Sequence, residues 1–233
     1  MKRVLTIPFL ILIIQFSTRA NDSTNTEVQL NPKKSGGALL IDFGFNNLID
    51  SKDPYRLKFL GSRGLNIYYM YQLRIGYFFS INPGVGLGFD NYSFQNENLR
   101  LYPWNGTLVT VLDSTDKINY FKSKLSTTYL DVPLEIRFKS SQNDKKAFHL
   151  ALGGKVGFLV NSKSKYKFEE NNITIKQKQI SNLYVNPIRY GVTGRIGYGL
   201  FQVFAHYSLT PLFQKSKSVE ITPFMCGITL STL

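Results

Sequence analysis

Cysteine is almost absent from this sequence of 233 residues, which contains one, Cys226. An intramolecular disulfide and a metal site with several cysteine ligands are therefore excluded. Acidic residues are also scarce, because 15 Asp and Glu stand against 28 Lys and Arg and leave a formal net charge of +13. Beyond the N-terminus there is no apolar run of the about 20 residues that a membrane-spanning helix needs. The chain is thus neither a disulfide scaffold nor a bundle of membrane helices.

The N-terminus has the features of a secretory signal peptide. Lys2 and Arg3 precede an apolar run over residues 4–16, and Thr18-Arg19-Ala20 provides a cleavage site of the small-residue type. Cleavage after Ala20 removes two Arg and one Lys with no acid, so the net charge falls from +13 to +10. An exported chain rarely meets nucleic acid, and we therefore expect no nucleic-acid partner.

Downstream of the signal peptide, apolar and polar residues alternate with a period of two. In residues 127–138 most even positions are apolar, while the odd positions include Asp131, Glu135 and Arg137. Such alternation indicates a strand with one apolar and one polar face. The pattern recurs in eight segments: 39–46, 65–75, 79–90, 127–138, 148–160, 188–198, 201–208 and 224–231.

The connections between these segments alternate in length. The short ones cover 74–77, 139–146 and 198–200, and the long ones cover 48–62, 95–123, 162–186 and 210–221. This arrangement predicts an all-β fold, an eight-stranded antiparallel up-and-down transmembrane β-barrel with short periplasmic turns and long extracellular loops. Two long connections contain a hairpin of their own, 99–112 around Asn105-Gly106 and 165–176.

Alternation alone also fits a soluble periplasmic carrier of the lipocalin type, whose apolar face points inward. Two features favour the membrane barrel. The polar face is rich in glycine, as a narrow interior requires, and has few lysines. Phe148 and Phe158 lie ten residues apart, which at ~3.3 Å per residue and a ~40° tilt spans roughly 25 Å, the height of an outer-membrane apolar band. We therefore expect the bacterial outer membrane, with a signal peptide at 1–20, a short polar segment at 21–36 and the barrel at 37–233.

Charged residues on the polar face form a predicted luminal network. Its acids and bases are nearly balanced, and an eight-stranded barrel is just wide enough for its own side chains to fill it. Because an uncompensated buried charge is costly, we expect these groups to be paired and the lumen to be plugged. The residues are Asp42, Arg74, Asp90, Asp131, Glu135, Arg137, Lys155, Arg189 and Arg195.

Much of the basic excess lies in one long connection, 162–186. Lysines there outnumber the two acids Glu169 and Glu170, and a solvated loop alone would explain them. Facing outward, the same lysines would meet the phosphates of surface lipopolysaccharide, so outer-membrane lipid and lipopolysaccharide are the expected partners. This basic patch consists of Lys163, Lys165, Lys167, Lys176 and Lys178.

Several motifs resemble those of the PorT-like outer-membrane β-barrel proteins of Bacteroidota. They are YLDVPLEIRF at 129–138, GGKVG at 153–157, RYGVTGRIGYG at 189–199, YSLTPLF at 207–213, Pro223-Phe224 and Gly227-Ile228. The resemblance is firm from about residue 125 to the end and implies an eight-stranded outer-membrane barrel. The founding member is tied to secretion of surface proteins, but that role does not transfer with the resemblance, because many members share only the barrel. Envelope or secretion-associated proteins are a further class of partner that we expect.

The leading functional hypothesis is a non-enzymatic barrel that serves in envelope structure or as an accessory to transport or surface assembly. An enzymatic alternative uses His206, Ser208 and Glu220, whose spacing resembles that of outer-membrane lipid A deacylases. In our register His206 and Ser208 point inward, away from lipid. The glycines at 84, 86 and 88 lie within an alternating strand with no helix after them, so a dinucleotide site is not expected, nor any other cofactor or metal.

Overall fold

The structure, a computed structural model, describes residues 36–49, 51, 53–105, 107–112, 119–141, 146–170, 173–179, 183–215 and 217–232. The predicted signal peptide and most of the polar segment that follows it lie outside these ranges. Among the described residues, no helix combines the length and the apolar character that a membrane span requires. Their helical structure is one short 3-10 turn, η1 (Phe59–Gly61), and a single residue at Lys146.

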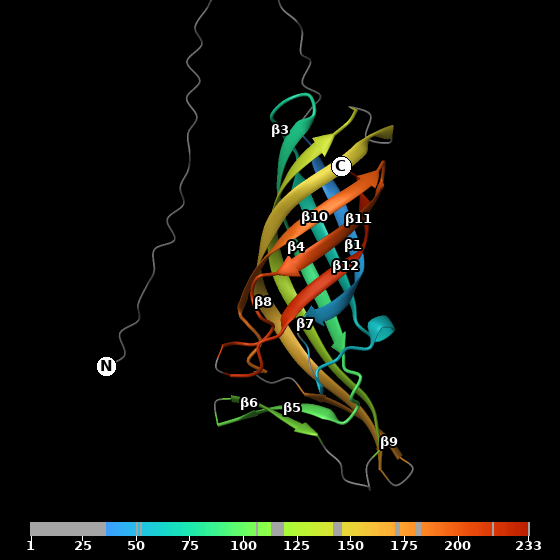
Figure 1. The fold of residues 1–233 in the computed structure, drawn as a ribbon, viewed down its shortest axis with the longest axis vertical. Helices are drawn as coiled ribbons and strands as arrows, with labels where there is room; N and C mark the ends of the chain where they lie inside the picture. The colour runs from blue at the N-terminus through green and yellow to red at the C-terminus, as the bar shows by residue number, and fades with distance from the viewer. Residues whose placement is uncertain are drawn as a thin grey trace, which may run out of the picture. The chain divides into compact units, whose positions relative to one another are not determined.

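Eight antiparallel strands form a closed ring, as predicted (Figure 1). Each strand pairs with its neighbours in the chain, and β1 pairs with β12 to close the ring. The short strand β3 (Leu73–Arg74) continues β2 beyond Gln72 and also pairs with β4. The ring strands are β1 (Gly37–Ile49), β2 (Arg63–Tyr71), β4 (Phe79–Ser93), β7 (Asn119–Lys139), β8 (Phe148–Glu170), β10 (Ile188–Tyr198), β11 (Phe201–Ser208) and β12 (Thr222–Ser231).

The predicted apolar face points outward and the predicted polar face inward. On β7, Leu134 and Ile136 are exposed, whereas Asp131, Glu135 and Arg137 are buried. The outward apolar side chains of the ring strands form a surface that we call the apolar band. Such a surface is unfavourable in water but matches the hydrocarbon of a bilayer, in which a closed ring leaves no backbone group unpaired.

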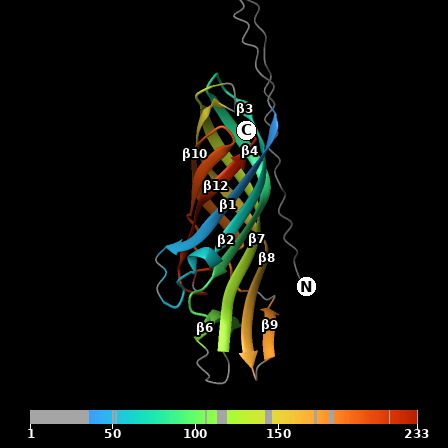
Figure 2. The same ribbon diagram turned by 90° about the vertical axis from the view of Figure 1, so that its right-hand side faces the viewer.

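Two ring strands run past the barrel at its long-loop end. β7 begins at Asn119 and β8 continues to Glu170, where β9 (Ile173–Gln179) pairs with it (Figure 2). We call residues 119–126 of β7, 163–170 of β8 and the strand β9 the projecting sheet. The limits 127 and 160 that we predicted for the membrane strands fall several residues short of the observed strands, although the hairpin predicted at 165–176 does continue the sheet beyond the membrane. Outside the membrane both sheet faces are polar or are covered by protein, so the alternation that marks a lipid-facing strand disappears.

The two hairpins predicted within the long connections are present. β5 (Leu99–Trp104) and β6 (Thr107–Leu112) pair around Asn105, which has a φ of 44° as a tight hairpin turn requires. β8 and β9 pair from Ser164↔Gln179 to Glu170↔Ile173. The long-loop end therefore contains ordered sheet as well as connections.

The position of a charged substitution along the apolar band should decide how far it lowers the free energy of unfolding. Arg in place of Leu134, in the middle of the band on β7, is expected to lower the free energy of unfolding by about 2–4 kcal/mol, because the charge lies near the bilayer midplane. Arg in place of Val160, at the long-loop end, should cost about 0–1 kcal/mol. Urea titration in phospholipid vesicles measures both values, and equal costs would contradict this placement of the band.

Candidate functional site

The luminal charges form two groups, of which the first is centred on Arg195. Its guanidinium donates to both carboxylate oxygens of Asp42, at 2.5 and 2.9 Å, and its Nε donates to Glu135 Oε1 at 2.8 Å. Glu135 Oε2 in turn accepts from Arg137 Nη2 at 2.8 Å. All four side chains are buried, and Thr229 donates its hydroxyl to Asp42. This group joins β1, β7, β10 and β12 across the lumen.

The second group is centred on Arg189 and Asp131. Arg189 Nη1 donates to Asp90 Oδ2 at 2.6 Å, and its Nη2 donates to Asp131 Oδ2 at 2.9 Å. Lys155 Nζ reaches the same Asp131 oxygen at 3.2 Å, and the Tyr68 hydroxyl donates to it at 3.1 Å. The ring of Tyr129 lies 3.9 Å from the Arg189 guanidinium carbon, a distance typical of a cation–π contact.

The two groups together contain four acids and four bases, so their formal charges cancel. The four acids are Asp42, Asp90, Asp131 and Glu135, and the four bases are Arg137, Lys155, Arg189 and Arg195. Desolvated charges are tolerated only when they are paired and hydrogen-bonded, which these contacts provide. Arg74, the ninth predicted member, lies near the short-turn end, and its guanidinium donates to Gln72 at 3.3 Å.

Several side chains that complete the lumen were not part of the predicted network, although the alternation of residues 127–138 had placed Tyr129 on the inward face. Tyr68 and Tyr129 contact the second charge group, and Leu40 and Met70 are fully buried near the short-turn end. The face that we expected to be polar therefore also carries large apolar and aromatic groups. Strict polarity is unnecessary because neighbouring side chains, and not water, fill a narrow barrel. The inward position of Tyr68 follows from the alternation around it, but its bond to Asp131 required the structure.

Glycine at position 157 allows the second charge group to lie close to the backbone of β8. A β carbon there would lie 2.2 Å from Asp131 Oδ1 and 2.9 Å from the Arg189 side chain. Because β8 pairs Gly157 with both Asp131 on β7 and Arg189 on β10, the ion pair passes directly over its backbone. The glycine-rich inner face predicted from the sequence thus provides space for charges, at this position at least.

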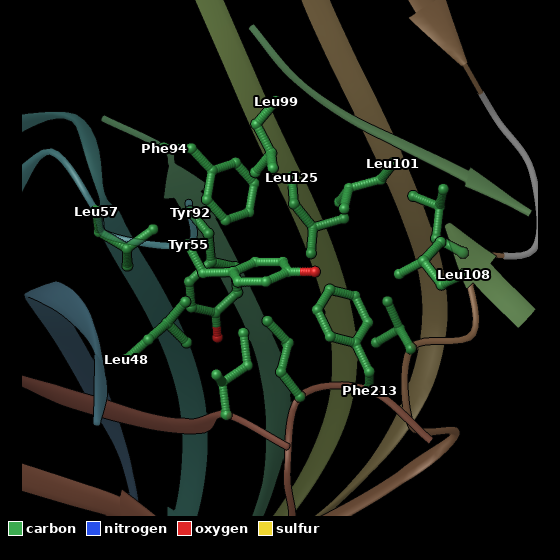
Figure 3. Packing of buried hydrophobic residues seen from close by; sticks show 14 of the residues in the cluster. Leu48, Tyr55, Leu57, Tyr92, Phe94, Leu99, Leu101, Leu108, Leu125 and Phe213 are labelled. Carbon is green, nitrogen blue, oxygen red and sulfur yellow. The ribbon is translucent and has the colours of Figure 1, made fainter. Parts of the chain in front are cut away.

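An apolar cluster fills the long-loop end of the barrel (Figure 3). Its side chains come from the ends of ring strands, from the β5–β6 hairpin and from the connections that precede β2, β10 and β12. Leu99, Leu101 and Leu125 are fully buried, and Phe213 is 1% exposed. The members are Leu48, Tyr55, Leu57, Tyr92, Phe94, Leu99, Leu101, Leu108, Leu125, Tyr129, Leu183, Val185, Leu212, Phe213 and Ile221.

A small cavity remains among Asp90, Lys155, Arg189 and His206, with a volume of about 20 Å³. This is room for one water molecule and far below the roughly 300 Å³ at which small-molecule sites begin. At this level of the barrel, the side chains of the charge groups and of the neighbouring apolar residues therefore leave space for little more than one water molecule.

The structure does not assemble the predicted enzymatic residues. His206 Nδ1 is 2.9 Å from the Thr193 hydroxyl, and the Ser208 hydroxyl donates to the carbonyl oxygen of Thr210 at 2.8 Å. Both side chains are buried, whereas Glu220 is exposed in the connection between β11 and β12. Nucleophilic catalysis needs a base within hydrogen-bond reach of the serine, and here each group is bonded to a different partner.

The predicted basic patch lies on the projecting sheet. Lys165 and Lys176 are exposed, and Lys163 and Lys167 are half-buried, with the Lys167 Nζ 5.8 Å from the centre of the Phe121 ring. For Lys178 the structure describes the backbone position in β9. Two further lysines of β7, Lys122 and Lys124, belong to the same surface and were missed because our predicted strand began too late.

Removing the carboxylate shared by two bases should destabilise the barrel strongly. Asp131→Asn leaves Lys155 and part of Arg189 without a counter-charge, so the free energy of unfolding is expected to fall by about 3–5 kcal/mol. Glu97→Gln, which breaks the surface pair with Lys58, should cost about 0–1 kcal/mol. Urea titration of both variants in vesicles tests the difference, which would vanish if the luminal pairs were unimportant.

A side chain at position 157 should act through crowding. Gly157→Val pushes the Asp131–Arg189 pair apart, and we expect the free energy of unfolding to fall by about 1–3 kcal/mol. Gly194→Ala is the matched control, because its nearest contact would be a Leu152 side-chain atom at an ordinary 3.6 Å, and it should stay within about 0.5 kcal/mol of the wild type. A similar loss in both variants would mean that strand propensity, and not the ion pair, decides the effect.

Among the solved structures that match this chain are two of Ail, the attachment invasion locus protein of Yersinia pestis. The first is 15% identical, with a TM-score of 0.34, over 84% of this chain and 97% of that chain. The second, in complex with the heparin analogue sucrose octasulfate, is 16% identical, with a TM-score of 0.36, over 85% of this chain and 99% of that chain. Comparison with curated proteins finds no match.

A family comparison matches most of the chain. The family model described as "Outer membrane protein beta-barrel domain" covers residues 18–214. This match agrees with the closed antiparallel ring and its outward apolar band. The chain therefore belongs to this family of β-barrel proteins and resides in the bacterial outer membrane.

Proposed function

We propose that this protein is a non-enzymatic barrel that acts through its extracellular loops, in envelope structure or as an accessory to transport or surface assembly. The observation that carries the proposal is the filled lumen, in which eight paired charges lie beneath an apolar cluster. A barrel filled in this way has neither the aqueous path of a porin nor a ligand cavity. What it offers to other molecules is its outer surface and its loops.

The loops add structure that a minimal membrane anchor does not need. The projecting sheet extends both β7 and β8 and adds a strand to them, and the β5–β6 hairpin packs against it through Arg100 and Leu101. Ordered surface of this kind costs conformational entropy and favours a role in recognition. The motifs from residue 129 onward support a finer assignment to the PorT-like barrels of Bacteroidota, with envelope or secretion-associated protein partners.

Two measurements on the purified protein test this proposal. In planar bilayers we expect no steady conductance, because the described lumen has room for about one water. Incubation with lipopolysaccharide should release no fatty acid, because the His206 ring nitrogen and the Ser208 hydroxyl are bonded to different partners. The folded state is checked by heat-modifiable migration on gels.

Contrary results have a definite meaning in each assay. A reproducible conductance would show that the charge groups or the apolar cluster open in the membrane, and a transport function would replace the proposed one. Fatty-acid release that disappears in Ser208→Ala would establish the enzymatic alternative.

A further inference from the structure

The lysines of the projecting sheet are arranged in rows that cross all three strands. Lys122 lies directly opposite Lys167, which lies opposite Lys176. In the adjacent row Lys124 lies opposite Lys165, which lies opposite Lys178. Directly paired residues of antiparallel strands share a sheet face, so these six residues and Lys163, two positions from Lys165, share one face. We call these seven residues the lysine face.

This arrangement is unfavourable in the protein by itself. Like charges that lie directly opposite each other destabilise a sheet, and here four such pairs occur together. Burial, together with the nearby Lys122, Lys165 and Arg63, lowers the pKa of Lys124. Among the six lysine-face residues whose side chains the structure describes, which excludes Lys178, none takes part in an ion pair with another described residue, although Glu169 lies one row further out. The face thus has a positive potential that an external anion would relieve.

The other face of the projecting sheet is already occupied. The backbone N–H of Leu101 in β5 donates to the Tyr166 hydroxyl at 2.7 Å, and the Arg100 guanidinium lies 4.2 Å from the centre of the Tyr120 ring. The Ser123 hydroxyl donates to the carbonyl oxygen of Leu99. β5 therefore covers that face and leaves the lysine face turned outward.

The lysine face continues the lipid-facing surface of the barrel. On β7 the outward positions run from Leu134 and Leu130 in the apolar band to Lys124 and Lys122. Lys124 lies six residues beyond Leu130, roughly 15 Å along the membrane normal at ~3.3 Å per residue and a ~40° tilt. Phe59 in η1 stacks on the outward Phe45 with ring centres 4.6 Å apart, and Arg63 follows it in the chain. Charge therefore replaces apolar surface where a bilayer changes from acyl chains to headgroups.

We propose that the lysine face binds the phosphate groups of lipopolysaccharide in the outer leaflet around the barrel. This proposal rests on the outer-membrane location and gives the extracellular loops a partner. Ammonium groups bind phosphate by charge and direct hydrogen bonds, and several of them on adjacent strands can hold the phosphates of one or more lipids. The lateral position, continuous with the apolar band, selects a membrane lipid over an anion arriving from solution.

Binding of purified lipid A to the full chain in detergent tests the proposal. The ligand is used in its bisphosphorylated and its dephosphorylated form, so that phosphate and acyl contributions separate. The variant Lys124→Gln/Lys165→Gln/Lys176→Gln removes one lysine from each strand. At about fivefold per basic residue near an anionic surface, we expect affinity for the bisphosphorylated form to fall roughly 100-fold at low salt. The difference should shrink as salt screens the charges.

A matched control removes the same charge elsewhere. Arg56→Gln/Lys146→Gln/Lys215→Gln loses three exposed positive residues outside the lysine face and should bind bisphosphorylated lipid A within about twofold of the wild type. Both variants should keep heat-modifiable migration, because none of the six residues lies in the lumen. The conductance and fatty-acid measurements do not depend on the lysine face, so this proposal can fail while the proposed function stands.

Three results would overturn the proposal. Equal affinities for the two forms of lipid A would show that the acyl chains decide binding. Equal weakening in the variant and its control would assign the effect to net charge. Unchanged binding with increased aggregation of the lysine-face variant would assign the lysines to protection of the β9 edge, a known use of lysine on exposed strands.

Discussion

Strand β1 pairs with β12 and β8 pairs with β10, so the sheet has no open edge in the part of the ring that the apolar band surrounds. Hydrocarbon offers no hydrogen-bond partner, and every N–H and C=O in that region must find one within the sheet. Closure with eight strands then sets the width of the interior, which is just enough for side chains. Side chains therefore have to fill the lumen, and those with a charge have to be paired within it.

Inside the ring, ion pairs between acidic and basic side chains take the place of the water that would otherwise solvate these charges. Arg189 and Arg195 each bridge two carboxylates from different strands, and Lys155 and Arg137 complete the pairs. Such contacts link strands far apart in the sequence and make the barrel a unit across its short axis. Replacing one partner by a neutral residue leaves a desolvated charge without a counter-charge. Such a substitution therefore lowers the free energy of unfolding strongly, even though the intact pair contributes little net stability.

Beyond the apolar band the same strands no longer have to satisfy every backbone hydrogen bond within the sheet. Water can reach the backbone there, so an open edge such as β9 is allowed, and one sheet face can serve recognition while β5 covers the other. The apolar cluster at this end packs the bases of the loops against one another. Surface recognition and a plugged membrane domain therefore coexist in one continuous sheet.

The sequence by itself determined the ring, because lipid on one side and packed polar groups on the other impose a period of two on each membrane strand. It also determined which charges point inward, since Asp131, Glu135 and Arg195 all follow that period. Only the tertiary structure decided which charges pair and that Arg74 lies apart from both charge groups. It also decided that Tyr68 and Tyr129 contact the second group. These contacts join strands on different sides of the lumen, so they depend on the register of all the strands between them. The tertiary structure also decided where β7 and β8 end and that their lysines align in rows, since the alternation of apolar and polar residues stops where the lipid stops.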